Sequence, residues 1–230
     1  MMSKAKAQDR PDGRMTQAER TALSDRRMFA AAIELINERG TQKTTLKEIG
    51  ERAGYSRGLA NYRFGSKDGL MIELFEQFDH VWKAHLDEYM GGATGIDALR
   101  QAASALRDFL KKESGYMRAM YLLWYECLGH DTEMRRNLAE HHDVYRQGAQ
   151  RWIEQGIEAG QIRAGIDPSL FAAHYCAFVF GTVYQWLVDA NALDLDAVID
   201  GYVENTIAFM TYQDNNEETK DCLLYTSPSP

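Results

Sequence analysis

The sequence predicts an all-helical protein, and three observations lead to that prediction. The 230 residues include only four prolines, which break helices, and 45% of the residues are apolar, which is enough for a globular core. Apolar residues recur at intervals of three and four, the spacing of amphipathic helices. No segment of useful length alternates between apolar and polar residues as a strand would, and no internal repeat is visible.

The first two predicted helices lie before residue 55. One covers about residues 20–39 and ends at Gly40. Its apolar face is formed by Phe29, Ala32, Ile33 and Ile36. Thr45 and Glu48 then form a Thr-x-x-Glu capping box, so a second, short helix is expected to begin there. Gly54 lies where that helix must end, because glycine readily adopts the left-handed conformation of a helix terminus.

A third short helix is predicted over residues 57–64, with Ser56 as its N-cap. It has little apolar surface beyond Leu59, Ala60 and Phe64. Ser66 can cap a further helix that begins at Lys67. Two short helices joined by a glycine turn have the spacing of a helix-turn-helix, in which the second helix enters a DNA major groove. A helix with so little core-facing surface is expected to use its other face for contact with a partner.

Side chains on and around this third helix are candidates for DNA contact. Arg57 and Asn61 can pair bidentately with guanine and adenine edges, whereas Tyr62 is better placed for phosphates. The candidate set is Thr45, Lys47, Ser56, Arg57, Gly58, Leu59, Asn61, Tyr62, Arg63 and Lys67. Two alternatives remain open: a helical hairpin with a solvated basic face, and a helix-turn-helix-derived interaction or sensor protein that does not bind DNA.

Charge is distributed unevenly along the chain, whose net charge is −8. Residues 1–67 contain 14 basic and 8 acidic residues, a balance of +6, and residues 68–230 contain 12 and 26, a balance of −14. Such asymmetry is expected where one end of a chain meets a polyanion.

Residues 20–75 closely resemble the DNA-binding domain of TetR-family regulators. The matching residues are Thr44, Thr45, Ile49, Ala53, Gly54, Ser56, Gly58, Phe64, Ser66, Lys67 and Leu70. The family usually has aromatic residues where Asn61 and Arg63 stand, which bears on the operator sequence and not on the binding mode. The resemblance implies a homodimeric, ligand-responsive transcriptional regulator, most often a repressor of a palindromic operator.

The rest of the chain up to residue 212 is predicted to form further helices. They cover residues 67–90, 96–112, 116–128, 133–159, 168–190 and 195–212. Thr132 is the expected cap of the fourth of these, and Asp167 with Pro168, and Asp194, are the caps of the last two. The segment 116–128 is apolar almost all round, so it is expected to be buried.

The last two predicted helices carry apolar stripes wider than one neighbouring helix would cover. The candidate interface residues are Phe178, Gly181, Thr182, Gln185, Val188, Tyr202, Asn205 and Phe209. A glycine inside a helix costs about 1 kcal/mol, so Gly181 suggests a close helix approach. The stripes are also compatible with the core of a monomer, but the resemblance implies a two-fold four-helix bundle.

Aromatic and methionine residues gather in the middle of the chain, where the resemblance implies an effector cavity. The candidate effector-binding residues are Met120, Tyr121, Trp124, His141, Phe178, Gln185 and Trp186. A mostly apolar effector held by a few polar groups would suit such a lining. Plain core packing is the alternative, because aromatic stripes and satisfied histidines are common in cores.

Nothing in the sequence indicates an enzyme, a cofactor or a metal site. Gly-x-Ser-x-Gly, a phosphate-binding glycine loop and His-Glu-x-x-His are all missing from the sequence. His141 and His142 point about 100° apart on a helix and cannot easily share a metal. Cys127, Cys176 and Cys222 fit no disulfide framework, and the first two are expected in the core. Without a long apolar run or a secretory leader, we expect a cytoplasmic protein.

The expected domain organisation has four parts. Residues 1–19 form a disordered arm, residues 20–66 the helix-turn-helix domain, residues 67–212 the ligand-binding and dimerisation domain, and residues 213–230 a disordered tail. The last ten residues resemble translated sequencing-adapter read-through, so we expect them to be non-native.

Overall fold

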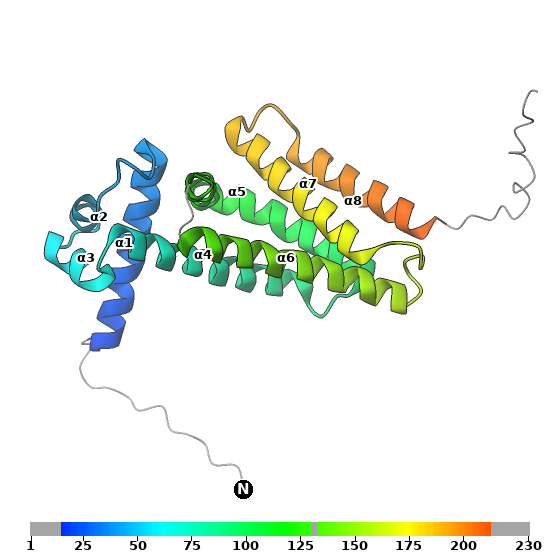
Figure 1. Ribbon diagram of the computed structural model, residues 1–230, viewed down its shortest axis with the longest axis horizontal. Coiled ribbons are helices and arrows are strands. Elements are labelled where there is room, and N and C mark those ends of the chain that lie inside the picture. Colours follow the sequence, from blue (N-terminus) through cyan, green and yellow to red (C-terminus); the bar gives the residue numbers. More distant parts are fainter. Residues whose placement is uncertain (1–14, 130–132, 213–230) are drawn as a thin grey trace, which may run out of the picture. The chain divides into compact units, whose positions relative to one another are not determined.

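The structure is a computed structural model that describes residues 15–129 and 133–212 (Figure 1). Within these ranges the chain forms eight helices and no strand, which confirms the all-α prediction. The helices are α1 (Gln17–Arg39), α2 (Leu46–Arg52), α3 (Arg57–Phe64), α4 (Lys67–Met90), α5 (Gly95–Cys127), α6 (Glu133–Glu158), α7 (Pro168–Val188) and α8 (Leu195–Thr211). Most of the predicted N-terminal arm, the Thr132 cap and the tail from residue 213 lie outside the described residues.

The chain divides into two compact units. The first contains the residues up to Gln77 together with Arg118–Glu126, and the second contains Phe78–Met117 and the residues from Cys127 onward. Helices α4 and α5 therefore contribute to both units. This is not the same division as the functional domains proposed from the sequence, which meet between residues 66 and 67.

Local capping explains where the first helices begin. The Thr45 hydroxyl accepts a hydrogen bond from the Glu48 N–H at 3.3 Å, and the Glu48 carboxylate accepts one from the Thr45 N–H at 3.2 Å. The same reciprocal pair joins Thr16 and Glu19. Helix α1 therefore begins at Gln17, inside the segment that the sequence interpretation assigned to a disordered arm. The Thr16–Glu19 capping box explains this earlier start, because it satisfies free N–H groups in the first turn of α1.

The core of the first unit lies where α1, α2 and α3 meet, with the start of α4. Helix α2 packs against both α1 and α3. The fully buried side chains are Met28, Ala32, Ile36, Ile49, Ala60, Leu70 and Leu74. Each lies on the apolar face of its helix, so burial of these faces holds the short helices in place.

Gly54 forms the turn between α2 and α3 in the left-handed region, with φ +81°. A Cβ atom there would meet nothing within 4 Å, so a Gly54→Ala change strains only the backbone. We expect it to lower the free energy of unfolding by about 1–2 kcal/mol in a denaturant titration. Gly58→Ala is the matched control, because helical Gly58 gains helix propensity and meets only ordinary contact at 3.9 Å. Equal stability of the two variants would contradict a turn that depends on this conformation.

The second unit is a bundle built from α6, α7 and α8 with parts of α4 and α5. Helix α7 packs against α6 and α8 (Figure 1). The fully buried large side chains of this bundle include Phe78, Phe109, Leu110, Ile153, Ile199 and Met210. The Asp167 carboxylate accepts hydrogen bonds from the N–H groups of Ser169 and Leu170, and Asp194 accepts one from Ala197. These bonds confirm the two caps predicted for α7 and α8.

Basic residues of α5 pair with acidic residues of α8 along the outside of this bundle. The Arg100 Nε lies 3.2 Å from Glu204, and Arg107 Nε and Lys111 Nζ lie 3.1 and 2.9 Å from Asp196. Exposed pairs of this kind contribute little individually, but they align the two helices.

The predicted break within α5 is present as a kink. The predicted helices 96–112 and 116–128 meet at Glu113, which leaves helical geometry with φ −121° and ψ 31°. Helix α5 is therefore two helical segments joined at this kink. The expectation that the second segment is buried all round was wrong: Leu122, Tyr125 and Leu128 are 38, 50 and 65% exposed. Its apolar residues exceed what the neighbouring helices cover.

No described helix combines the length and hydropathy that a bilayer crossing requires.

Candidate nucleic-acid interface

Helix α3 is held against the first unit by one apolar side and displays the other. Ala60 and Phe64 are buried, and the Phe64 ring lies 5.7 Å from that of Phe29 on α1. The Ser56 hydroxyl accepts a hydrogen bond from the Leu59 N–H at 3.3 Å, as its predicted N-cap role requires. Together with α2 and the Gly54 turn, this arrangement confirms the helix-turn-helix.

The outward side of α3 collects several predicted DNA contacts. Gly58, Asn61 and Tyr62 are exposed, and Tyr62 is 89% exposed. These positions are three and four residues apart, which places them on one face of a helix that begins at Arg57. Leu59 is half-buried beside this face. A large polar aromatic side chain left in solvent on so short a helix is available to a partner.

Helix α2 contributes the first-turn candidates Thr45 and Lys47. The Thr45 and Ser56 hydroxyl groups already act as helix caps within the protein. The Lys47 side chain is 55% exposed, and its Nζ lies 3.8 Å from Glu51 in a loose pair one helical turn apart. Lys47 is therefore accessible, and such an exposed pair is easily exchanged for a phosphate.

Arg63 and Lys67 occupy different surroundings from those the sequence interpretation gave them. The Arg63 guanidinium is bound by Asp25 and Glu73, with nitrogen–oxygen distances of 3.0 and 2.7 Å. The Lys67 Nζ donates to the Thr41 carbonyl oxygen at 2.6 Å. Both cations are engaged inside the first unit, so neither is a free charge on the outward face of α3.

Sequence reasoning missed the two acidic partners of Arg63. Asp25 lies 38 residues before Arg63 and Glu73 lies 10 residues after it. No local spacing rule connects residues on three separate helices. The only signal was the basic residue in place of the usual aromatic at position 63.

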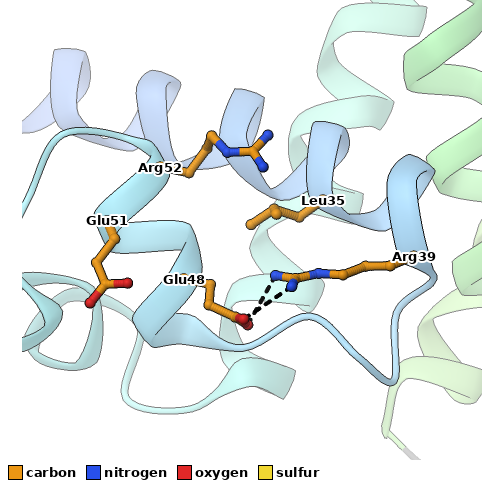
Figure 2. A pocket seen from close by; sticks show the side chains of 5 residues that line it. All are labelled: Leu35, Arg39, Glu48, Glu51 and Arg52. Carbon is orange, nitrogen blue, oxygen red and sulfur yellow. Dashed lines mark hydrogen bonds and ion pairs between the residues drawn. The ribbon is translucent and has the colours of Figure 1, made fainter.

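A charged depression of about 260 Å³ lies beside α2, lined by Leu35, Arg39, Glu48, Glu51 and Arg52. Figure 2 shows Arg39 reaching Glu48, with a 3.0 Å hydrogen bond between them. Arg52 instead pairs with Glu38 and Glu34 of α1, and the hydrogen bond that Arg52 donates to Glu38 contributes most to raising the Arg52 pKa. The main charges of the depression are thus paired across α1 and α2, which suits a structural role better than ion binding.

The effector candidates are distributed over both units. In the first unit Met120, Tyr121 and Trp124 are buried, the last two rings lie 4.9 Å apart, and burial raises the pKa of Tyr121. In the second unit His141 is buried, with its Nδ1 2.6 Å from the Asp79 carboxylate. That contact is typical of a satisfied core histidine.

The remaining effector candidates lie on α7. Phe178 stacks on Tyr202 of α8, with ring centroids 3.6 Å apart, and Trp186 is half-buried. Gln185 is exposed, and its amide donates to the Gly181 carbonyl oxygen at 3.3 Å. A nearby cavity between α5, α7 and α8, of about 10 Å³, would hold roughly one water molecule and no effector.

The candidate interface residues on α7 and α8 are mostly accessible. Val188 and Phe209 are 68 and 61% exposed, and Gln185 and Asn205 are also exposed. A Cβ atom at Gly181 would meet nothing within 4 Å, so no helix of the same protomer approaches it closely. Tyr184, which widens the predicted stripe, is also exposed, and Leu170 and Tyr212 add exposed apolar area that the sequence interpretation did not include.

Thr182 is the exception among these interface candidates. Its side chain is buried, with only 5% of the residue exposed. It faces the interior of its own protomer because it lies on the side of α7 that packs into the bundle. It is therefore a core residue and not a surface contact.

Cys127 and Cys176 are buried free thiols, which confirms their prediction as core residues, and Cys222 lies outside the described part of the chain. Within residues 15–129 and 133–212, no three His, Cys, Asp or Glu side chains are arranged to hold a metal ion.

The fold resembles several solved regulators. A fatty acid degradation regulator FadR from Bacillus halodurans gives a TM-score of 0.69 at 18% identity, covering 80% of this chain and 94% of that one. NalD, the secondary repressor of the MexAB-OprM multidrug efflux pump in Pseudomonas aeruginosa, gives 0.64 at 20% identity, covering 86% of this chain and all of the other. These likenesses confirm the architecture of a helix-turn-helix followed by a helical C-terminal part.

Sequence comparison adds the family. Residues 29–74 match the model described as bacterial regulatory proteins, tetR family. The HTH-type transcriptional regulator TtgR of Pseudomonas putida is 24% identical over 183 residues, covering 77% of this chain and 86% of that protein. The fatty acid metabolism regulator protein of Bacillus subtilis is 23% identical over 175 residues, covering 76% and 89%. The chain belongs to the TetR family of DNA-binding transcriptional regulators.

Proposed function

We propose that this regulator is a cytoplasmic homodimeric repressor that leaves a palindromic operator when a small, mostly apolar effector binds. The observation that carries the proposal is the exposed face of α3, on which Asn61 and Tyr62 stand free of the core. Two such faces in a dimer would enter successive major grooves about one helical turn apart. Selection of bound sequences from random duplexes tests the proposal, and a palindromic consensus is the expected result.

The proposed contacts divide into two kinds. Arg57 and Asn61 read base edges, because their side chains can form bidentate pairs with guanine and adenine. Tyr62 and Lys47 bind phosphates and so position the helix against the DNA backbone. Arg63 and Lys67 are left out of this set, since both are engaged by groups of the protein itself.

Substitution of Arg57 tests the base-reading part. We expect Arg57→Ala to lose about 1–3 kcal/mol of binding free energy for the selected operator and to relax the preferred sequence. Lys47→Ala is the matched control and is expected to weaken selected and random duplexes alike. Fluorescence anisotropy with both duplexes over a series of salt concentrations measures the difference. An unchanged affinity ratio in Arg57→Ala would show that Arg57 does not read bases.

The chemistry of the effector is supported by relatives and by composition. One solved relative is FadR from Bacillus subtilis in complex with stearoyl-CoA, and another is a SmeT–triclosan complex; both ligands have large apolar parts. The buried aromatic residues of this chain would suit such a ligand. The effector can act only by binding the DNA-released conformation more tightly than the DNA-bound one.

The dimer is proposed from the exposed apolar surface of α7 and α8. Val188, Phe209 and their neighbours leave more apolar area in water than an isolated bundle needs. A two-fold partner would bury this area and place two α3 helices on one operator. Sedimentation of the chain as a monomer at micromolar concentration would exclude this assembly.

A further inference from the structure

The guanidinium group of Arg63 is bound along two edges by carboxylates from two other helices. On one edge Nε and Nη2 each donate to Asp25 of α1 at 3.0 Å. On the other edge Nη1 and Nη2 donate to Glu73 of α4 at 2.9 and 2.7 Å. The three residues, called the Arg63 cluster here, tie α3 to both α1 and α4.

The geometry of the Arg63 cluster favours a fixed orientation of α3. Bidentate pairs between arginine and carboxylate are stronger and more directional than single contacts, and lysine cannot reproduce the planar fork. The hydrogen bonds that Arg63 donates to Glu73 and, next in effect, to Asp25 raise the pKa of Arg63, so the cation persists. The Arg63 side chain is about one-third exposed, and its guanidinium carbon lies 4.8 Å from the centre of the Phe64 ring.

Helix α3 needs such a restraint because its apolar attachment is small. Among the side chains of α3 whose burial is described, Ala60 and Phe64 are buried. Two buried side chains are a small apolar anchor for the rotation of a helix about its axis, and base recognition depends on that rotation. The ion pairs to α1 and α4 add two further points of attachment.

We propose that Arg63 is a positioning residue for DNA recognition: it orients α3 so that Arg57 and Asn61 reach the bases, and it does not itself contact DNA. The inference rests on the proposed function of α3 as the reading helix. Because Glu73 belongs to α4, the Arg63 cluster also makes the orientation of α3 depend on the first half of that helix.

The acidic members of the cluster give the sharpest test. Removing a carboxylate from a DNA-binding surface normally strengthens binding, because the carboxylate repels phosphates. The Arg63 cluster leads to the opposite expectation. Asp25→Asn and Glu73→Gln should weaken binding to the selected operator, since each removes one of the two ion pairs that hold Arg63. Binding of these variants to random duplexes should stay the same or improve.

The experiment uses the full chain with Arg63→Met, Asp25→Asn and Glu73→Gln, and compares the selected operator with a random duplex. We expect Arg63→Met to lower operator affinity roughly 10- to 100-fold, as for the loss of one or two base contacts. The slope of log affinity against log salt should remain that of the wild type, because no phosphate contact is lost. The Arg63→Met/Glu73→Gln double variant should lose no more operator affinity than Arg63→Met alone.

Arg52→Met is the matched control, because it breaks ion pairs between α1 and α2 and leaves α3 untouched. It is expected to keep the wild-type ratio of operator to random affinity. Thermal unfolding and the DNA-binding stoichiometry of each variant establish that folded protein is compared. If Arg63→Met does not fold, Glu73→Gln, which has the same size and keeps a hydrogen-bonding amide, carries the test.

Two results would overturn the inference while leaving the proposed function intact. A salt slope reduced by about one in Arg63→Met, with acidic variants that bind as well as the wild type, would identify a phosphate contact. An unchanged affinity ratio in all three variants would identify an ion pair that serves the fold alone. If the wild type itself enriches no sequence from random duplexes, the proposed function fails and the inference fails with it.

Discussion

Replacing Gly181 with arginine is expected to separate the proposed dimer into folded monomers and to remove tight operator binding. In the protomer a side chain at this position enters open space, because a Cβ atom would meet nothing within 4 Å. The protomer itself therefore tolerates the change, and it gains helix propensity of up to about 1 kcal/mol. In the proposed bundle the same side chain would bring a bulky charge into the contact between two copies of α7.

The expected loss of operator affinity is about 10²- to 10⁴-fold, which is what the linkage of two DNA-binding domains in one dimer typically contributes. Sedimentation velocity measures the assembly, circular dichroism measures the helix content, and anisotropy with whole and half operators measures binding. Gly148→Arg on α6 is the control, because that glycine also faces nearly open space, with its nearest contact at 4.0 Å. A Gly181→Arg protein that remains dimeric would place the interface elsewhere.

The second large effect is expected at Trp124. It is buried, and its ring lies 4.9 Å from that of Tyr121. Trp124→Ala should lower the free energy of unfolding by about 3–5 kcal/mol in a urea titration, because it removes a large buried side chain and leaves a cavity. Trp124→Phe keeps an aromatic ring and should lose less.

Trp124→Phe also separates an effector wall from plain core. If Trp124 lines the effector site, this variant should bind the operator normally but should no longer be released from it by stearoyl-CoA or triclosan, provided that one of them releases the wild type. The melting temperature of the wild type should rise with that ligand, since a ligand that binds only folded protein stabilises it. A destabilised variant with an unchanged response would assign Trp124 to the core alone.

The absence of catalytic motifs, read from the sequence, agrees with membership of a family of regulators and not of enzymes. The departures at Asn61 and Arg63 were also visible in the sequence, but their meaning was not. Asn61 stands exposed and remains a candidate for reading DNA, whereas Arg63 turns to two carboxylates. The two residues that depart from the family pattern in this short helix thus lie in different surroundings.

The sequence by itself determined the features that depend on neighbours within one helical turn. The Thr45–Glu48 capping box, the Ser56 cap, and the Asp167 and Asp194 caps all join residues two to three positions apart. Their hydrogen bonds satisfy helix ends wherever the helix lies in the fold. Helix bounds could therefore be predicted to within a few residues, and the helix-turn-helix followed from their spacing.

Only the tertiary structure decided which side of each helix is covered and which charge meets which. It buried Thr182 while leaving Val188, on the same helix, in solvent, and it exposed Tyr125 in a segment that is apolar almost all round. It also brought Asp25 to Arg63 across 38 residues. The physical reason is that burial and long-range ion pairing depend on how helices pack against one another, and periodicity within one helix specifies its apolar face but not the partner that covers it.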